Sequence, residues 1–300
     1  MQFVGVRLWD WLMPLAGWVL AFLALGAAVA VACWLLVFTE GAYLGPRVVT
    51  VLYDRYAGRY DRVKAYDKHY ERHFVGEPVA RFLAERMEVL PQPVWLLDAA
   101  SGTGRFTQTV MQAAGSELRF VCLDSSGPML EQAFRNLDGI AAAGQVFYVQ
   151  HNAGSLPFAD NAFPVVACLE ALEFVPQPRT LIGELVRVAR PGGLLMLTNR
   201  VGWQSHLFPG RRFEREQLAG LLRSRGCSYV SITPWQVDYD RVLAVKEGGS
   251  AMPPPLDWRN IVRCESCSQV SWDGYGAMLR CRQCGAVFTE TDGIWRFAAS

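Results

Sequence analysis

Two pairs of cysteines near the end of the chain have the spacing of metal ligands. Cys264 and Cys267 are separated by two residues, as are Cys281 and Cys284. Four thiolates suit a tetrahedral Zn²⁺ ion, and a site whose ligands all come from protein is structural rather than catalytic. In a reducing compartment such a cluster favours a metal site over disulfides. A segment this small has too little core to fold alone, so we expect zinc to stabilise it.

A second chemical signal is the run Asp-Ala-Ala-Ser-Gly-Thr-Gly at 98–104, which follows the apolar stretch 94–97. Glycines let the backbone approach a ligand closely, and the start of a following helix supplies free N–H groups. The spacing is not that of the G-x-G-x-x-G turn of dinucleotide-binding folds, and Ala100 stands where a first loop glycine would fall. The pattern predicts a ligand site where a strand runs into a helix.

The elements that position this loop alternate regularly along the chain. Apolar runs predict strands at 94–97, 118–123, 145–150, 165–169, 194–198, 229–233 and 241–246. Helices are expected at 105–114, 128–137, 179–190 and 214–225. This alternation implies an α/β fold, Rossmann-like, with a seven-stranded, mostly parallel sheet and helices on both faces. No helix separates the last two strands, so we expect a C-terminal antiparallel hairpin at the sheet edge.

Residues 94–107 resemble motif I of the class I S-adenosylmethionine-dependent methyltransferases, in the branch that includes the quinone-biosynthesis methylases. The similarity continues through 122–130, 152–158, 170–175 and 188–193, and it covers about residues 50–247. The resemblance implies that the chain is an enzyme that binds S-adenosylmethionine. The residues it implies for cofactor binding are Asp98, Ala100, Gly102, Gly104, Asp124, Met129, Asn152, Ala153 and Glu170.

The resemblance also implies roles for these residues. Asp98 is expected near the methionine amino group, directly or through water, and the two loop glycines beside the methionine and ribose. Asp124 is expected to accept both ribose hydroxyls, Met129 to pack against adenine, and Asn152 to reach the adenine amino edge. A base is needed only when the acceptor must lose a proton, and Glu170, Glu173 and His151 are the candidates. The sequence assigns the role to none of them, so the catalytic residues are left unknown.

The segment from Trp11 to Thr39 contains no charged residue. About 20 apolar residues suffice to cross a bilayer as a helix, so we expect one membrane-spanning helix. A cleaved signal peptide and a buried core helix are the competing interpretations, but the run is long for either. Basic residues follow it at Arg47, Arg55 and Arg59. The positive-inside rule therefore places the rest of the chain in the cytoplasm.

The sequence divides into four parts: a membrane anchor at 1–40, a methyltransferase domain at 41–247, a linker at 248–257 and a zinc ribbon at 258–300. The start of the second part, 41–92, is amphipathic and helical by its periodicity. It either packs one face on the main domain, or forms a lid over the substrate pocket, or lies on the membrane surface.

These observations favour a membrane-anchored methyltransferase with a small or lipid-like acceptor. The ribbon also resembles zinc ribbons that accompany methyltransferases, including the small activators of RNA and protein methylases. A methyltransferase of RNA or protein is therefore the first alternative, and a possible protein partner would bind through the ribbon. A non-enzymatic membrane scaffold that retains the fold is the second. The net charge is +1 and the ribbon has few basic residues, so nucleic-acid binding is not supported.

Overall fold

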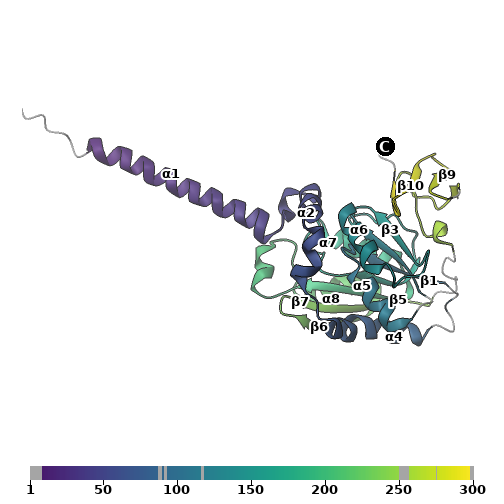
Figure 1. The fold of residues 1–300 in the computed structure, drawn as a ribbon. Helices are drawn as coiled ribbons and strands as arrows, with labels where there is room; N and C mark the ends of the chain where they lie inside the picture. Colours follow the sequence, from purple (N-terminus) through teal and green to yellow (C-terminus); the bar gives the residue numbers. More distant parts are fainter. Residues whose placement is uncertain are drawn as a thin grey trace, which may run out of the picture.

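The structure is a computed structural model that describes residues 9–86, 90, 93–115, 118–249, 257–274 and 276–297, with side chains from residue 16 onward. A long helix projects from an α/β domain, and the cysteine-rich end of the chain lies at the opposite side of that domain (Figure 1). The predicted linker falls mostly on residues 250–256, which lie outside the described residues.

One continuous sheet forms the centre of the domain, in the order β6-β7-β5-β4-β1-β2-β3-β11-β10-β9-β8. Strands β1 to β5 are mutually parallel, whereas β7 is antiparallel to both β5 and β6, which confirms the predicted hairpin. The strands are β1 Val94–Ala99, β2 Leu118–Asp124, β3 Val146–Gln150, β4 Phe163–Cys168, β5 Ala189–Arg200, β6 Cys227–Gln236, β7 Tyr239–Lys246, β8 Trp272–Asp273, β9 Met278–Cys281, β10 Val287–Thr291 and β11 Ile294–Phe297.

The prediction of a seven-stranded sheet was wrong, because the sheet has 11 strands. Strand β11 of the cysteine-rich segment pairs in parallel with β3, through Ile294 with Tyr148 and Trp295 with Val149. Strand β3 would otherwise be a free edge with unpaired N–H and C=O groups. Its pairing with β11 satisfies them, so the ribbon extends the sheet rather than standing apart.

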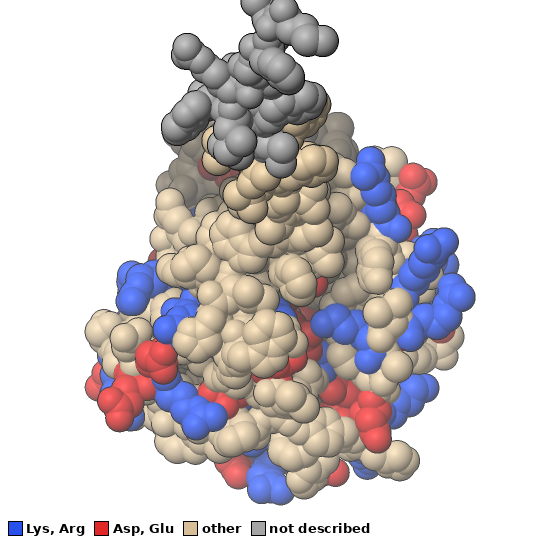
Figure 2. All heavy atoms as spheres, turned by 90° about the vertical axis from the view of Figure 1, so that its left-hand side faces the viewer, with Lys and Arg blue, Asp and Glu red and all other residues tan. Residues whose placement is uncertain are grey.

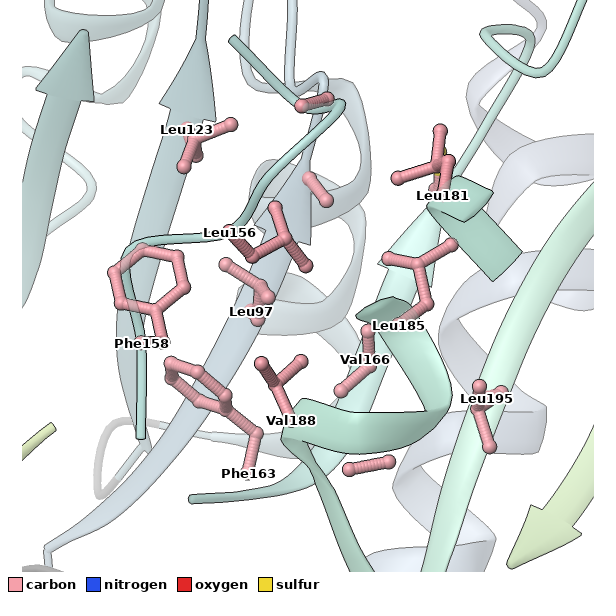
Figure 3. Close-up of a cluster of buried hydrophobic side chains, with 14 of the residues drawn as sticks. Leu97, Leu123, Leu156, Phe158, Phe163, Val166, Leu181, Leu185, Val188 and Leu195 are labelled. Atoms are coloured by element: carbon pink, nitrogen blue, oxygen red, sulfur yellow. The ribbon is translucent and has the colours of Figure 1, made fainter. Parts of the chain in front are cut away.

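The sheet is covered by helices whose apolar faces pack on it. These helices are α4 Glu77–Ala84, α5 Arg105–Ala114, α6 Gly127–Leu137, α7 Pro178–Val188 and α8 Arg215–Ser224. Figure 3 shows one layer of this packing, in which Leu185 and Val188 of α7 lie against Val166 of β4. Leu279, Phe288 and Trp295 of the cysteine-rich segment belong to the same buried cluster, so that segment shares the core of the domain.

The connection from α7 to β5 differs from the prediction of a helix up to residue 190 and a turn at 191–193. Helix α7 ends at Val188, and β5 begins at Ala189. The register between β4 and β5 shifts between Phe163 and Val165. Pro191 lacks an N–H group and Gly192 has φ 75°, so the predicted turn is accommodated as an irregularity within the strand.

The N-terminal part begins with α1 Trp9–Cys33 and a π-helical turn, Trp34–Phe38. Residues Ala16–Phe38 form one helix long and apolar enough to cross a membrane, and none of it is buried against the rest of the chain. Its end is held to the domain, because the Trp34 indole donates to the Leu207 carbonyl at 3.2 Å and the Tyr43 hydroxyl donates to the Pro209 carbonyl at 2.8 Å. The short helix Ala42–Leu44, the longer α2 Pro46–Lys64 and the short helices α3 Lys68–Glu71 and Arg72–Gly76 follow.

Candidate cofactor site and cysteine cluster

A cavity lies at the carboxyl ends of β1, β2 and β4, where open parallel sheets bind ligands. Six of the nine predicted cofactor residues line it, namely Ala100, Gly102, Asp124, Asn152, Ala153 and Glu170. The other side of the cavity is formed by α2 and by the segment 169–176 after β4. Its volume is about 110 Å³, which is smaller than the roughly 300–1,000 Å³ of most small-ligand sites.

Asp124 ends β2 and joins the first two loops of the site. Its Oδ2 accepts a hydrogen bond from the Gly102 N–H at 2.8 Å, and its Oδ1 accepts one from the Ser126 N–H at 2.9 Å. Burial raises the pKa of Asp124, while these N–H groups oppose the rise. Gly102 has φ 52°, which glycine adopts at little cost. Ala100 has φ 55°, a left-handed conformation that its methyl group disfavours.

Asp98, Gly104 and Met129 lie behind the cavity wall rather than on it. The Asp98 carboxylate accepts from the Thr107 hydroxyl at 2.9 Å and from its N–H at 3.3 Å. Burial raises the pKa of Asp98 to about 7, against the effect of these hydrogen bonds. Gly104 has φ 82° and precedes α5, and a Cβ there would lie 3.3 Å from Ala133. Met129 is buried in α6.

Asn152 and Ala153 form the far wall of the cavity. The Asn152 side-chain oxygen accepts a hydrogen bond from the Gly154 N–H at 2.9 Å, and the side-chain nitrogen takes no part in this bond. Ala153 is 7% exposed and presents only a methyl group. A flat apolar contact beside an amide has the chemistry to take a purine ring with its polar edge.

Helix α2 covers the cavity and is fixed by polar contacts at successive turns. The Thr50 and Ser125 hydroxyls are 3.0 Å apart, the Ser126 hydroxyl donates to Asp54 at 2.5 Å, and the Thr103 hydroxyl donates to Asp61 at 2.5 Å. All three partners belong to the loops after β1 and β2. Segment 41–92 was expected to pack on the domain, to form a lid over the substrate pocket or to lie on the membrane surface. Helix α2 does the first and also lines one side of the cavity, as a lid would.

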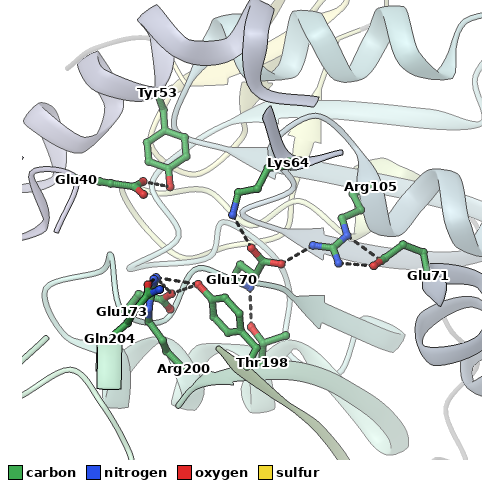
Figure 4. Close-up of polar contacts among 11 residues, drawn as sticks. Glu40, Tyr53, Lys64, Glu71, Arg105, Glu170, Glu173, Thr198, Arg200 and Gln204 are labelled. Atoms are coloured by element: carbon green, nitrogen blue, oxygen red, sulfur yellow. Dashed lines mark hydrogen bonds and ion pairs between the residues drawn. The ribbon is translucent and has the colours of Figure 1, made fainter. Parts of the chain in front are cut away.

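A network of ion pairs reaches the cavity at Glu170 (Figure 4). Arg105 at the start of α5 makes a bidentate contact with Glu71, at 2.8 and 2.5 Å, and a contact with Glu170 at 2.5 Å. Lys64 of α2 also donates to Glu170, at 2.8 Å. Burial raises the pKa of Glu170, but Arg105 and Lys64 outweigh burial and hold that pKa below its usual value.

A second buried carboxylate, Glu173, lies near the network. Arg200 donates to its Oε1 at 3.1 Å, the Tyr239 hydroxyl also donates to Oε1, and the Arg200 Nη2 donates to Gln204 at 2.6 Å. Burial raises the pKa of Glu173 despite these donors. Sequence patterns gave no direct signal for Arg105, Arg200 or Tyr239. Only the position of Arg105, at the first turn after the glycine loop, could have indicated it.

The four clustered cysteines come together as predicted. The sulfurs of Cys264 and Cys284 are 3.5 Å apart, as are those of Cys267 and Cys281, and all four lie within 4.8 Å of one another. Four sulfurs at about 2.3 Å from one Zn²⁺ would be about 3.8 Å apart in a tetrahedron. The donor set and spacing therefore fit zinc, which would tie the end of β9 and the turn after it to the loop that follows Val262.

Contacts also connect this segment to the cofactor cavity. The Arg296 guanidinium donates to the Gln150 side chain at 2.6 Å, and Gln150 donates to the Ser125 carbonyl at 3.0 Å. Ser125 lines the cavity. On the other side, the His151 Nε2 lies 3.4 Å from Glu265, inside the first cysteine pair. The ribbon thus supports the loops after β2 and β3.

Residues 97–197 match a family model described as "Methyltransferase domain". The matched segment contains the glycine loop, Asp124 and the carboxyl ends of β1, β2 and β4 that surround the cavity. The chain therefore carries an S-adenosylmethionine-dependent methyltransferase domain.

Curated relatives of this chain include quinone-biosynthesis methylases. The ubiquinone/menaquinone biosynthesis C-methyltransferase UbiE of Klebsiella pneumoniae subsp. pneumoniae is 35% identical over 102 residues, which cover 34% of this chain and 41% of that protein. The match thus spans less than half of the relative. Among solved structures, a SAM-dependent methyltransferase from Aquifex aeolicus is 16% identical and covers 60% of this chain and 98% of that one, with a TM-score of 0.42. Magnesium protoporphyrin IX methyltransferase from Synechocystis PCC 6803 is 21% identical, with coverages of 59% and 80% and a TM-score of 0.45.

Proposed function

We propose that this chain is a membrane-anchored methyltransferase that moves a methyl group from S-adenosylmethionine to a small, lipid-like acceptor. The observation that carries the proposal is the cavity under α2, where Asp124, Gly102 and Asn152 meet within the segment that matches a methyltransferase domain. The similarity to a quinone-biosynthesis C-methyltransferase supports an acceptor of quinol type. The apolar helix Ala16–Phe38 directly precedes the elements that close the cavity.

Different residues of the site bind different parts of the cofactor. Asp124 supplies carboxylate oxygens for the ribose hydroxyls, and Asn152 supplies an amide for the adenine edge. Arg105 and Lys64 are neutralised by Glu170 and, for Arg105, by Glu71, so this network fixes the position of Glu170 at the cavity wall without leaving an excess of charge. When bound, the sulfonium supplies the methyl group, so that its C–S bond breaks, a bond to the acceptor forms and the acceptor's displaced proton goes to solvent. The chain's own contribution is to position the two reactants.

The methyltransferase domain and the ribbon are proposed to lie on the cytoplasmic side of the membrane. Helix α2 carries Arg47, Arg55, Arg59 and Arg62 just after the apolar helix, as the positive-inside rule requires. Seen from the side on which α1 projects, uncharged atoms occupy the middle of the molecule, and Lys and Arg side chains gather mainly at its sides (Figure 2).

The ribbon's contacts favour a small acceptor over a macromolecule. Several of its described aromatic side chains pack inside the molecule, since the Trp258 ring packs at a tilt against Trp295, 4.6 Å between ring centroids, and against Phe147 of β3, 4.7 Å between centroids. Rings that pack against one another in this way contribute to the fold of the ribbon rather than to an exposed binding surface. We therefore propose that the ribbon binds zinc and stabilises the edge of the sheet.

The test is methyl transfer by the full chain in detergent or in vesicles. Membrane extracts incubated with isotope-labelled S-adenosylmethionine should yield a labelled lipid-soluble product with the protein and none without it. Calorimetry should detect cofactor binding. Absence of binding would sink the proposal and favour a scaffold, and label confined to RNA or protein would favour the macromolecular alternative.

A further inference from the structure

The cofactor cavity shares lining residues with two other hollows. A polar chamber beside it is lined by Glu40, Lys64, Arg200 and Tyr239, among others. An apolar groove beyond that is lined by Leu36, Val37, Leu52, Tyr53, Tyr56, Tyr60 and Val63, together with Glu40 and Lys64. Tyr53 and Tyr60 border all three hollows. These two tyrosines therefore stand where cofactor, polar chamber and apolar groove meet.

The groove lies where the apolar helix joins the domain. Leu36 and Val37 belong to the last turn of the helix Ala16–Phe38. Val37 is 66% exposed and Val63, on α2, is 60% exposed. Apolar side chains grouped at the end of a membrane helix are at the depth of the lipid head groups and upper acyl chains. Such a surface is unfavourable in water but is suited to hydrocarbon.

Polar groups mark the inner end of the groove. The Tyr53 hydroxyl donates to the Glu40 carboxylate at 2.7 Å. Glu40 has φ 48°, so the backbone bears a left-handed conformation to hold this carboxylate in place. The ring of Tyr53 meets Phe174 edge to face at 5.9 Å, and Phe174 also lines the cofactor cavity. Aromatic walls beside a carboxylate acceptor suit a hydroxylated aromatic ring.

The geometry points to a path from the bilayer for an amphiphile with a hydrocarbon tail and a hydroxylated aromatic head. The tail occupies the apolar groove between Val37 and Val63, and the head enters the polar chamber beside Glu40 and Tyr53. This path rests on the proposed function insofar as the head is the methyl acceptor. The residues that line the apolar groove, from Leu36 to Lys64, all precede residue 97 and lie outside the segment that matches the methyltransferase family. The matched segment alone therefore does not form this path.

Photolabelling of the full chain in lipid nanodiscs tests this path without requiring catalysis. The probe is decyl hydroquinone with a diazirine at the end of its tail. Each methylene buried strengthens binding by roughly fourfold. A Val63→Trp side chain that displaces two or more methylenes should therefore reduce specific labelling of Leu36, Val37 and α2 by roughly tenfold or more. Excess unlabelled decyl hydroquinone should compete for the same labelling.

Val51→Trp is the matched control, because Val51 is also on α2, is 47% exposed and lines none of the three hollows among the described residues. It should label like the parent. Equal labelling of parent and Val63→Trp, or labelling that spreads evenly along the apolar helix and resists competition, would overturn the path. Melting temperature and S-adenosylmethionine binding confirm that both variants are folded.

The two proposals fail in different ways. Methylation of a tail-less hydroquinone, together with labelling that Val63→Trp does not reduce, would retain the methyltransferase and reject the path. The opposite result is labelling that unlabelled hydroquinone competes away and that Val63→Trp removes, with neither hydroquinone methylated. That result would retain the path and reject quinol methylation. If the path and the methyltransferase proposal are both correct, Val63→Trp should reduce methylation of the hydroquinone that carries a tail. Methyl transfer to the tail-less hydroquinone should be unchanged.

Discussion

Replacement of Asp124 by Asn is the sharpest test of the cofactor site. The carboxylate accepts N–H groups from Gly102 and Ser126 on separate oxygens, and its remaining lone pairs are available for the ribose hydroxyls. An amide keeps only one acceptor oxygen, so its NH₂ group must face either a backbone N–H or a ribose hydroxyl. The change removes the negative charge without altering the size of the side chain.

The expected effect follows from the hydrogen bonds lost. One hydrogen bond to a charged acceptor contributes about 1.5–3 kcal/mol, which corresponds to a rise of roughly 10- to 150-fold in the dissociation constant. Calorimetric titration with S-adenosylmethionine and with S-adenosylhomocysteine measures it. Both ligands should weaken by a similar factor, because both carry the same ribose.

Asp138→Asn is the control for this experiment, since Asp138 is exposed at the end of α6 and does not line the cavity. Thermal melting establishes whether the Asp124 variant is folded. A folded Asp124→Asn protein whose affinity stays within about twofold of the parent would refute the assignment of Asp124 as a ribose ligand.

Three further predictions concern pH, metal and the buried ion pairs. The pKa of Asp98 is raised to about 7, so the folded state binds more protons than the unfolded state between about pH 4 and 7, and stability falls as pH rises through this window. Asp98→Asn should flatten this dependence in thermal melts measured across the same pH range. An unchanged slope would contradict the prediction. Cys267→Ser should remove zinc, measured by elemental analysis, and lower the melting temperature by roughly 10 °C, or about 3 kcal/mol, whereas Cys33→Ser, on the exposed apolar helix, should change neither. Arg105→Met should destabilise the protein by about 3–5 kcal/mol in denaturant titrations, because it leaves Glu71 and Glu170 buried without their shared cation; a loss below about 1 kcal/mol would show that the carboxylates find other partners.

Much of the α/β domain could be predicted because its signals are local. Strand β1 reads as an apolar run, and α5 begins at Arg105 directly after the glycine loop, as expected. The antiparallel β6–β7 hairpin followed from the missing helix between two apolar runs. Helix ends were less accurate, because Pro191 and Gly192 looked like a stop signal although the structure places them within β5.

Individual site residues could be predicted only where they belong to a recognisable sequence motif. Asp124, Gly102 and Asn152 reach the cavity, whereas Asp98 and Met129 lie behind its wall. The partners that close the cavity were missed. Lys64 and Arg105 meet at Glu170 from segments 106 and 65 residues away, and no short-range pattern encodes such a meeting.

The sequence by itself determined the chemistry available to this protein: four thiols at metal-ligand spacing, a glycine loop between strand and helix, and an uncharged segment long enough to span a bilayer. Only the tertiary structure decided that β11 pairs with β3, that the sheet has 11 strands, and that Tyr53 and Tyr60 of α2 border three hollows. The physical reason is that residue types and their spacing express local propensity, whereas edge pairing and cavity walls arise from segments that meet only when the core has formed.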